Sequence, residues 1–305
     1  MDNRRIPRGA LLTGATGFVG SHLAARLARD GWRVSVVVRP ESSLTSLQNT
    51  LPSAALLRHD GTTAGMIDLV RQAKADVIFH LASQFVAEHT HADVETLICS
   101  NILFATQLVE AMAANRNIYL INTGSSWQHD DTGYAPVNLY AATKQAFEDI
   151  LAYYGSAHGL RVITLALFDT YGPADPRRKL LSILGQAIKS GEPLSLSPGR
   201  QLIDLVYIDD VVDAYVHCAD LLPKQENWHA RYGISSGQPR TLRELVAVIE
   251  SNLGITLPAK WGGRPYRDRE VMIPWTKSTP PPGWAPRTPL EAGIARTMGA
   301  TGDWH

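Results

Sequence analysis

Short apolar runs alternate with amphipathic segments along the first half of the chain. Apolar residues at 10–12 precede a segment, 17–30, in which apolar positions recur with the spacing of a helix, and a β-branched run follows at 32–38. The alternation continues, with strands expected at 54–58, 76–82, 117–122 and 161–167 and helices at 62–73, 93–114 and 137–158. Strands rich in β-branched residues that alternate with helices are typical of a parallel sheet buried on both faces. The pattern therefore predicts an α/β fold with a doubly wound parallel sheet.

Three features of the second half are local. Thr241 and Glu244 have the spacing of a capping box, which predicts a helix over 241–253. The acidic pair Asp209 and Asp210 precedes an apolar segment, so we expect it to cap a helix rather than to act as two catalytic carboxylates. The proline-rich stretch 274–289 predicts an ordered irregular segment or a wrapping tail.

Composition and charge narrow the class of protein. The 305 residues suffice for about two domains, and a formal net charge of zero gives no general attraction to nucleic acid or anionic lipid.

We expect no membrane span, because no run approaches ~18 uninterrupted apolar residues. We expect a cytoplasmic location, because the basic N-terminus lacks the apolar segment of a signal peptide. Cys99 and Cys218 lie in apolar contexts, as expected of buried free thiols. His89 and His91 have no further ligand at usable spacing, so we predict no metal site.

A glycine-rich stretch, Thr13-Gly14-Ala15-Thr16-Gly17-Phe18-Val19-Gly20, joins the first expected strand to the first expected helix. A strand that turns through glycines into a helix directs unpaired backbone N–H groups and the positive end of the helix dipole at one point, where a pyrophosphate can bind. Gly14 suits a tight turn, Gly17 a close approach to the phosphates, and Gly20 close packing of the helix on the sheet. Three glycines also occur in ordinary strand–helix turns, so the stretch predicts a dinucleotide cofactor only together with the motifs that follow.

The residue after the second expected strand indicates which dinucleotide binds. An acidic residue there takes the ribose 2′-hydroxyl of NAD, whereas an arginine accommodates the 2′-phosphate of NADP. Arg39 follows the strand, and we therefore predict NADP, with Arg39 and Ser42 or Ser43 around the phosphate. Two other interpretations stay open: Glu41 takes the ribose hydroxyls of NAD, or Arg39 is a solvated surface charge.

Two later segments carry groups suited to proton transfer. Hydroxyls gather at the carboxyl end of the fifth expected strand, in Thr123-Gly124-Ser125-Ser126, which is the edge at which open α/β sheets bind ligands. Tyr140 and Lys144 have i, i+4 spacing on an expected helix, which places the phenol and the ammonium on one face, one turn apart. A nearby ammonium lowers the pKa of a phenol, so we expect Tyr140 to act as general acid or base.

The motifs TGATGFVGSHL, HLAS, NTGSSW and YAATK, with the segment Asp169-Thr170-Tyr171-Gly172-Pro173, resemble those of extended short-chain dehydrogenases/reductases that act on nucleotide sugars. The resemblance covers nearly the whole chain and implies a Rossmann-type sheet with a smaller C-terminal α/β domain that binds the substrate. It implies a dinucleotide-binding domain at 1–170, to which 201–224 returns, and a smaller domain at 171–200 and 225–305. Segments at 205–212, 267–272 and 283–286 are similar to the CDP-abequose synthase group, which reduces the 4-keto group of a nucleotide-linked 4-keto-6-deoxyhexose.

The resemblance also assigns roles to single residues. It implies that Ser125, with Thr123 as second choice, Tyr140 and Lys144 are catalytic. The implied cofactor contacts are Gly14, Thr16, Gly17, Phe18, Val19, Arg39, Asp60, Gly61, Leu81, Ala82, Ser83, Thr123, Tyr140, Lys144 and Leu167. The implied substrate contacts are Ser83, Ser125, Ser126, Asp169 and Arg267, of which Arg267 meets the diphosphate.

One position departs from the family's pattern. The family usually has an arginine immediately before the aspartate at Asp204, and this chain has Ile203 there. Arg177, Arg178 and Arg200 are candidate substitutes. Relatives commonly dimerise through the helices equivalent to 93–114 and 137–158, so we expect a homodimer.

These residues together predict the NADPH-dependent reduction of the 4-keto group of a nucleotide-diphosphate sugar. Tyr140 is expected to protonate the alkoxide that forms on hydride addition, and Ser125 to hydrogen-bond the same oxygen. An NAD-dependent 4-epimerase, which uses the same groups, is the main alternative. A 4,6-dehydratase is disfavoured, because Ser126 and Trp127 stand where dehydratases carry an Asp-Glu pair. The catalytic set as a whole speaks against a non-catalytic dinucleotide-sensing protein.

Overall fold

A parallel sheet organises the molecule. Over residues 8–40, 42 and 51–299, which the computed structural model describes, seven strands pair in parallel in the order β13-β8-β5-β4-β1-β2-β3. The strands are β1 (Gly9–Thr13), β2 (Arg33–Val38), β3 (Ala55–Arg58), β4 (Val77–His80), β5 (Tyr119–Ser125), β8 (Arg161–Leu167) and β13 (His229–Ile234). The strand order reverses direction between β1 and β4, which opens a crevice at the carboxyl edge there.

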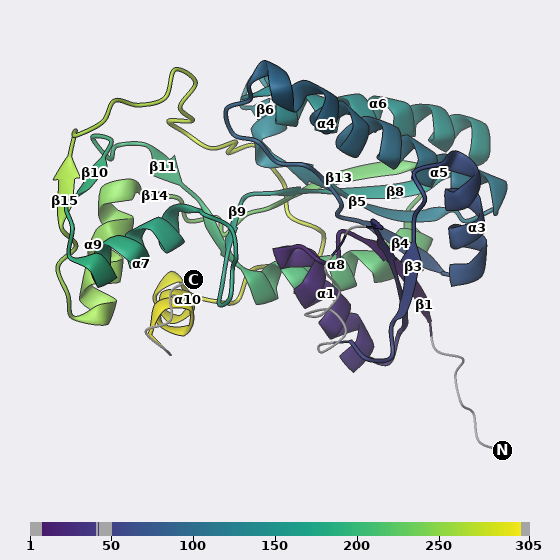
Figure 1. The fold of residues 1–305 in the computed structure, drawn as a ribbon, viewed down its shortest axis with the longest axis horizontal. Helices are drawn as coiled ribbons and strands as arrows, with labels where there is room; N and C mark the ends of the chain where they lie inside the picture. Colours follow the sequence, from purple (N-terminus) through teal and green to yellow (C-terminus); the bar gives the residue numbers. More distant parts are fainter. Residues whose placement is uncertain (1–7, 41, 43–50, 300–305) are drawn as a thin grey trace.

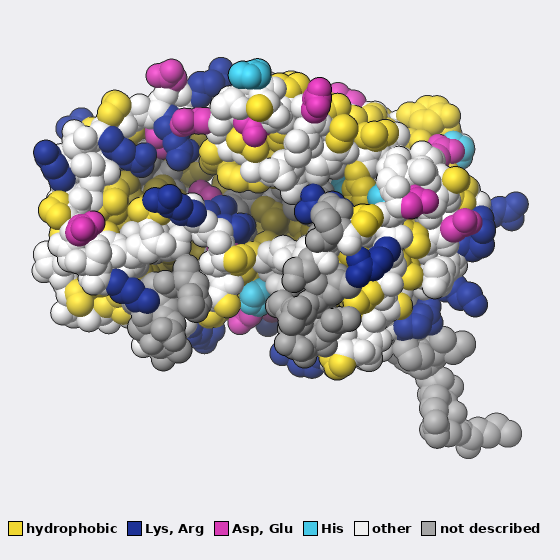
Figure 2. All heavy atoms as spheres, in the orientation of Figure 1, with side chains coloured by type: hydrophobic (Ala, Val, Ile, Leu, Met, Phe, Trp, Pro, Cys, Tyr) yellow, Lys and Arg dark blue, Asp and Glu magenta, His cyan; other side chains and the backbone are white. Residues whose placement is uncertain are grey.

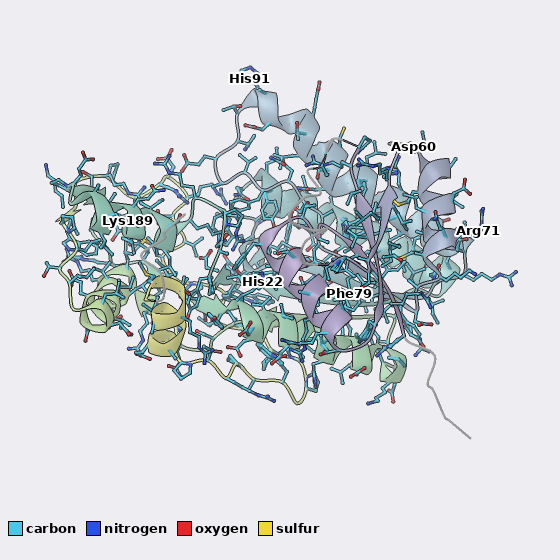
Figure 3. All side chains as sticks on the ribbon, turned by 60° about the horizontal axis from the view of Figure 1, so that its bottom comes forward. His22, Asp60, Arg71, Phe79, His91 and Lys189 are labelled. Atoms are coloured by element: carbon cyan, nitrogen blue, oxygen red, sulfur yellow. The ribbon has the colours of Figure 1, made fainter. Side chains whose placement is uncertain are left out.

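Helices cover both faces of this sheet (Figure 1). α1 (Phe18–Arg29) and α8 (Ile208–Leu221) pack on one face, and α3 (Thr63–Ala73), α5 (Phe104–Ala114) and α6 (Leu139–His158) pack on the other. Side chains alternate between the two cores along each strand: Leu12 and Phe79 belong to the core beneath α1 and α8, whereas Leu11 belongs to the core beneath the other three helices. Figure 3 shows Phe79 on the side of α1. The predicted doubly wound Rossmann-type sheet is confirmed.

The segment expected as one helix at 93–114 is continuous but irregular. A 3-10 turn (His91–Asp93) leads into α4 (Val94–Ile98), a π-helical turn (Cys99–Leu103) and α5. Within the described residues, His91–Ala114 is the one helix long and apolar enough to cross a membrane, with a mean hydropathy of 1.5 in its most apolar window, 44% of which is buried. Buried Asn101 and Gln107 on its inner side hydrogen-bond to neighbouring segments of the same chain, as in a core helix with one uncovered face.

A smaller body lies beside the carboxyl edge of the sheet (Figure 1). It contains α7 (Leu180–Ser190), α9 (Leu242–Leu253), α10 (Leu290–Met298), the pair β10 (Leu194–Leu196) with β15 (Ala259–Trp261), and the pair β11 (Leu202–Ile203) with β14 (Arg240–Thr241). Two parallel strands, β9 (Asp169–Tyr171) and β12 (Leu205–Tyr207), lead from the large sheet toward this body. The predicted capping box is confirmed, because Thr241 and Glu244 hydrogen-bond reciprocally at the start of α9.

Two segments differ from their predicted places. β13 lies in the large sheet, although it falls within the range 225–305 expected for the smaller domain, because its whole length pairs with β8. β5 continues to Ser125, three residues beyond the expected end, because its pairing with β8 continues to Leu167. The hydroxyls of Thr123 and Ser125 are therefore held by the sheet and not by a turn.

Two side-chain expectations were also wrong. Asp209 and Asp210 lie in the first turn of α8, whose N-cap is Tyr207, and Asp210 accepts hydrogen bonds from the backbone N–H groups of residues 287 and 288, each at 3.0 Å. Asp210 therefore holds the proline-rich segment against α8. Cys99 is exposed, because it lies on the outer side of the π-helical turn, whereas Cys218 is buried as expected.

Candidate active site

The turn between β1 and α1 has the geometry of a phosphate cradle. Gly14 has a φ of 76°, and a Cβ there would lie 2.6 Å from the backbone nitrogen of Ala82, so the turn requires glycine. Thr16 and Gly17 are exposed, and α1 begins without a side-chain cap or an acidic residue in its first turn. α3, α6 and α9 are each capped by a side chain. The uncapped amides and the helix dipole at this turn fit the pyrophosphate of a dinucleotide.

Thr13 joins this cradle to the end of β4. Its hydroxyl accepts hydrogen bonds from the backbone N–H groups of Leu81 and Ala82, at 3.2 and 3.1 Å, and contacts His80 Nδ1 at 2.8 Å. Burial, assisted by the charge of Lys144, lowers the pKa of His80 to about 3, so this imidazole is neutral. Leu81 and Ala82 therefore lie directly beside the glycine turn, as cofactor contacts require.

The carboxyl ends of β2 and β3 form the outer end of the crevice. Arg39 follows β2 and is exposed, and Arg58 ends β3, where it donates a hydrogen bond to the carbonyl of residue 40 at 2.7 Å. The β2–β3 register aligns Val38 with Arg58, so Arg58, which was not predicted, ends its strand beside the residue that precedes Arg39. Ser43, predicted with Ser42 as a neighbour of the phosphate, and Glu41, the residue of the NAD interpretation, lie outside the described residues.

Asp60, one of the predicted cofactor contacts, follows β3. One of its carboxylate oxygens accepts hydrogen bonds from the backbone and the hydroxyl of Thr62, both at 2.8 Å, which orders the start of α3. Figure 3 shows Asp60 at the margin of the sheet, near α3. Gly61 follows in a left-handed conformation, and its carbonyl accepts a hydrogen bond from Gln107 at 3.0 Å. This turn lies at the carboxyl end of β3, at one margin of the crevice.

Tyr140 lies in the first turn of α6. Asn138 caps this helix by accepting a hydrogen bond from Ala141 N at 2.9 Å, and its amide donates to Ala87 O at 2.9 Å. The Tyr140 side chain is buried, and its phenol hydrogen-bonds to the hydroxyls of Ser83 and Ser125. The structure thus brings together three hydroxyls that come from the ends of β4 and β5 and from α6.

The ionisation of this group differs from the expectation. Burial raises the pKa of Tyr140 to about 12, against the opposing hydrogen bonds of the two serines and the charge of Arg177. Burial also lowers the pKa of Lys144 to about 8, against the charge of Glu148. Lys144 Nζ lies 5.9 Å from the centre of the Tyr140 ring. Loss of hydration outweighs the two hydrogen bonds and the charge of Arg177, so Tyr140 is a neutral phenol at neutral pH, the form that donates a proton.

The structure distinguishes the two candidate hydroxyls on β5. Thr123 Oγ1 lies 2.6 Å from the hydroxyl of Tyr215 on α8, and both residues are buried on the side away from α6. Ser125 faces Tyr140. Thr123 and Ser125 are two residues apart on β5, so the pleat of the strand does not separate their side chains. The contact of Thr123 with Tyr215 is what distinguishes them. Ser125 is the residue placed for chemistry at Tyr140.

Asn101 supports the site, a role that the sequence pattern did not reveal. Its side-chain amide donates to Gln84 O at 3.0 Å and to Thr143 Oγ1 at 2.9 Å, and its carbonyl oxygen accepts a hydrogen bond from Ser83 Oγ at 3.2 Å. Thr143 lies one turn from Tyr140 on α6, so Asn101 joins the Ser83 loop to the catalytic helix. The π-helical turn that carries Asn101 has no signature in apolar periodicity.

A cleft of about 920 Å³ lies between the sheet and the smaller body (Figure 2). Ser126, Asp169 and Arg267, three predicted substrate contacts, line it. Its inner wall includes Phe85, whose ring meets Tyr140 edge-on at 4.9 Å and the indole of Trp127 at 5.6 Å. The cleft therefore borders the catalytic hydroxyls through an aromatic wall.

Basic side chains gather along this cleft, visible as dark blue around the hollow in Figure 2. They are Arg177, Arg178, Lys179, Arg264, Arg267 and Arg269. Arg267 Nε lies 3.2 Å from a carboxylate oxygen of Glu88, and Lys179 Nζ lies 3.4 Å from one of Asp169. Arg267 is thus in the cleft as predicted, with a carboxylate partner that the sequence pattern did not indicate.

The three candidate substitutes for the arginine missing at Ile203 have different surroundings. Arg177 donates to both carboxylate oxygens of Asp175, at 2.7 and 2.6 Å, and its guanidinium covers the ring of Phe18 at 4.6 Å. Arg200 is not part of the cleft lining, whereas Arg178 lines it and is exposed. Of the three, Arg178 is placed to meet an anion in the cleft.

The segment after Arg267 crosses the mouth of the cleft as a strap, which we define as residues 269–277. Arg269 donates to the backbone carbonyls of residues 136 and 137, at 2.9 and 2.8 Å. Asp131, in the hairpin of β6 (His129–Asp130) and β7 (Gly133–Tyr134), accepts hydrogen bonds from Thr276 N at 2.8 Å and Thr276 Oγ1 at 2.6 Å. The strap thereby joins the smaller body to the loop that follows Ser125.

The model of the family described as NAD dependent epimerase/dehydratase matches residues 10–229. The chain belongs to this family. Its members include enzymes of the extended short-chain dehydrogenase/reductase type, and membership supports a nicotinamide dinucleotide as the cofactor of the glycine cradle. In the described part of the chain, no group of three or more His, Cys, Asp or Glu side chains is arranged to hold a metal ion.

Named relatives match over nearly their whole length. The chain is 24% identical to the CDP-abequose synthase of Salmonella typhimurium over 94% of this chain and 96% of that protein. It is 27% identical to that of Salmonella muenchen over 96% and 98%, and 28% identical to the UDP-glucose 4-epimerase of Mycolicibacterium smegmatis over 94% and 96%.

Solved epimerase-type structures share the fold. MoeE5 in complex with UDP-glucuronic acid and NAD has a TM-score of 0.80 at 24% identity, covering 95% of this chain and 98% of that one. The UDP-glucose 4-epimerase of Thermotoga maritima has a TM-score of 0.83 at 22% identity, covering 95% and 97%. These similarities extend over both bodies of the molecule.

Proposed function

We propose that this enzyme uses NADPH to reduce the 4-keto group of a nucleotide-linked 4-keto-6-deoxyhexose, making a deoxysugar nucleotide. The observation that carries the proposal is the convergence of Ser83, Ser125 and a neutral Tyr140 beside the glycine cradle. The similarity to CDP-abequose synthases over nearly the whole chain supports the substrate class.

The chain's own groups account for the proton and the charge in this reaction. When bound, the nicotinamide supplies the hydride that adds to C4 of the sugar. Tyr140 donates its phenolic proton to the oxygen on which negative charge develops, and Ser125 donates a hydrogen bond to the same oxygen. Lys144, buried one turn along α6, stabilises the resulting phenolate and holds the ribose of the cofactor.

The two ends of the dinucleotide fall on different parts of the crevice. We assign the pyrophosphate to the turn of Gly14, Thr16 and Gly17 with the first residues of α1, and the adenosine 2′-phosphate to Arg39 with Arg58 beside it. Two guanidinium groups at this edge fit a dianionic phosphate better than a neutral hydroxyl, which supports NADPH over NADH.

We assign the nucleotide-diphosphate sugar to the cleft, with the smaller body as the substrate-binding domain. The sugar lies toward Ser126, Phe85 and Trp127, and the diphosphate toward Arg178 and Arg267. Six arginine and lysine side chains line the cleft beside six carboxylates, so an anionic ligand is supported by single cations such as the exposed Arg178 and not by a net charge of the lining.

An NAD-dependent 4-epimerase is the second candidate. It requires the same serine, tyrosine and lysine, and the 28% identity with a UDP-glucose 4-epimerase favours it. Dehydration is disfavoured, because Ser126 and Trp127 follow Ser125 and supply no carboxylate for proton removal. The two candidates differ in the cofactor balance: the reductase oxidises one NADPH in each turnover, whereas the epimerase regenerates its NAD.

NADPH consumption by the purified enzyme tests the proposal. The substrates are freshly generated CDP-, dTDP-, UDP- and GDP-linked 4-keto-6-deoxyhexoses, each assayed with the wild-type enzyme and with Tyr140→Phe. We expect turnover with one nucleotide and a loss of about 10²–10⁴-fold in the variant, the usual contribution of a positioned general acid. Absence of turnover, together with release of NAD on denaturation, would favour the epimerase.

A further inference from the structure

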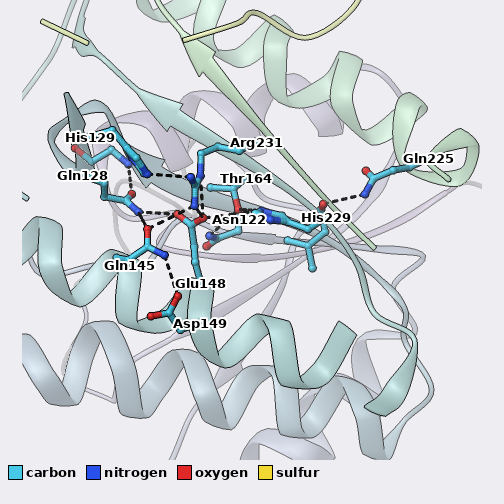
Figure 4. A network of polar contacts seen from close by, with 12 residues as sticks. Asn122, Gln128, His129, Gln145, Glu148, Asp149, Thr164, Gln225, His229 and Arg231 are labelled. Carbon is cyan, nitrogen blue, oxygen red and sulfur yellow. Dashed lines mark hydrogen bonds and ion pairs between the residues drawn. The ribbon is translucent and has the colours of Figure 1, made fainter. Parts of the chain in front are cut away.

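Glu148 continues the catalytic face of α6 one turn beyond Lys144. Tyr140, Lys144 and Glu148 are spaced at i, i+4 and i+8, so all three side chains face the sheet, and all three are buried. One Glu148 oxygen accepts a hydrogen bond from Gln128 Nε2 at 2.7 Å, and the other accepts two from the guanidinium of Arg231 on β13, through Nε at 3.0 Å and through Nη2 (Figure 4). The buried carboxylate is therefore fully paired.

The contact with Glu148 fixes the orientation of the Gln128 amide. A carboxylate only accepts hydrogen bonds, so the NH₂ group of Gln128 must face Glu148 and its carbonyl oxygen must face the other way. That oxygen accepts a hydrogen bond from the backbone N–H of Ser125 at 2.8 Å. A chain of hydrogen bonds thus runs from Arg231 through Glu148 to Gln128 (Figure 4), and from Gln128 to the backbone of Ser125.

Gly124 leaves room for this chain of contacts. A Cβ at residue 124 would lie 2.9 Å from Gln128 Oε1 and 3.5 Å from Glu148 Oε1, so any larger residue would displace the amide. Arg231 also donates to His129 Nε2 at 2.9 Å, which holds the segment after Gln128. The contacts come from the 3-10 turn after β5 (Ser126–Gln128), from α6, and from β13, which is separated from β5 by β8.

We propose that Gln128, Glu148 and Arg231 are positioning residues that fix the backbone of Ser125, and with it the hydroxyl that meets Tyr140. None of the three lines the cleft. The Ser125 side chain moves with the Ser125 backbone at the end of β5. Gln128 joins the backbone N–H of Ser125 to Glu148 on α6 and so limits this movement. The catalytic part of this inference rests on the proposed function, whereas the structural part does not.

Amide exchange tests the structural part without any substrate. Gln128→Met keeps the side-chain length and removes the hydrogen bonds, so the Ser125 amide should exchange with deuterium about fivefold to tenfold faster, as loss of one hydrogen bond predicts. Thr164→Val is the matched control, because its buried hydroxyl serves His229 and Asn122 in the same layer without touching Gln128. Unchanged exchange in Gln128→Met would overturn the proposal. If that variant does not fold, Glu148→Gln takes its place, with the same expectation.

A double-mutant cycle tests the catalytic part. We expect Gln128→Met to lower kcat about tenfold while the KM values for NADPH and for the sugar nucleotide stay within about twofold, and Thr164→Val to retain wild-type kcat. In a Ser125→Ala background the same substitution should have no further effect, because the group that it positions is absent. An equal loss in both backgrounds would show a general structural role and contradict the proposal. If the wild-type enzyme turns over no sugar nucleotide, the proposed function fails while the exchange result stands.

Discussion

Lys144 is buried, and the burial of its ammonium group lowers the stability of the folded protein. Its pKa is lowered by burial from an ordinary value of 10.5 to about 8, so between these values the unfolded chain binds the proton that the folded chain releases. The free energy of unfolding therefore rises with pH across this window. The cost is fully present below about pH 8 and disappears above about pH 10.5.

Replacing Lys144 should accordingly stabilise the protein while inactivating it. We expect Lys144→Met to raise the free energy of unfolding at pH 7 by on the order of 1–3 kcal/mol, and this gain to shrink toward zero near pH 10.5. Thermal unfolding of both proteins at pH 7, 9 and 10.5 measures the difference. A variant that melts below the wild-type enzyme at pH 7 would contradict the burial cost.

Arg39 should decide between the two dinucleotides. Arg39→Ala removes the proposed charge-assisted contact with the 2′-phosphate, so we expect NADPH to bind about 10–100-fold more weakly and NADH to bind with little change. Quenching of protein fluorescence on titration with each cofactor measures both affinities. Arg71→Ala, an exposed arginine on α3, is the control. Equal weakening of NADPH and NADH would count against a phosphate contact.

At the residue scale, the sequence predicts chemistry better than it predicts environment. Ser125, Tyr140 and Lys144 follow from motifs and spacing, and the structure brings the first two into contact. The high pKa of Tyr140 was not predictable, because it depends on burial by segments far apart in the chain. Glu148 and Arg231 were missed for the same reason, since 83 residues separate them.

At the element scale, the strap is the part most open to a targeted change. Asp131 is half-buried, and its hydrogen bonds with Thr276, which lower the pKa of its carboxyl group, hold the strap to the hairpin. We expect Asp131→Ala to raise the KM for the sugar nucleotide severalfold with kcat retained, because the strap lies at the cleft and not at the reacting hydroxyls. Steady-state kinetics measures both constants. The control is Asp68→Ala, which removes an exposed ion pair on α3; an unchanged KM in Asp131→Ala would refute a role for the strap in binding.

Sequence patterns predict the helices and strands that depend on neighbouring residues, and they do not predict a strand pairing between residues far apart in the chain. The alternation of strands and helices over 10–167 and the capping box of α9 were readable, because each depends on neighbouring residues. The return of β13 to the large sheet depends on pairing with β8, about 65 residues earlier. The π-helical turn interrupts a helix whose apolar pattern continues on either side, so periodicity does not reveal it.

At the scale of the whole molecule, the outer face of α4, α5 and α6 predicts a homodimer. Val94, Ile98, Leu103 and Tyr153 are exposed there, and two such faces would cover one another. We expect light scattering after size exclusion to give about twice the chain mass of 33.4 kDa, and Leu103→Glu combined with Ile98→Glu to give the monomer. A monomeric wild-type enzyme at micromolar concentration would contradict this prediction.

The central question for the whole molecule is which reaction a nucleotide sugar would undergo in the cleft between the two bodies. The cradle, the three hydroxyls and the aromatic wall suit both net reduction and reversible epimerisation of a nucleotide sugar. The fate of the hydride separates these outcomes directly, whereas the rate of NADPH loss depends on choosing the right nucleotide at a sufficient concentration.

The decisive measurement is the transfer of deuterium from NADPH labelled at the nicotinamide C4, followed by NMR of the sugar nucleotide. Net reduction predicts deuterium at C4 of the deoxysugar, with one NADP released for each sugar labelled, and loss of both signals in Tyr140→Phe. Inversion of a sugar hydroxyl at C4 with no label incorporated and no NADPH consumed would contradict the reductase and establish the epimerase.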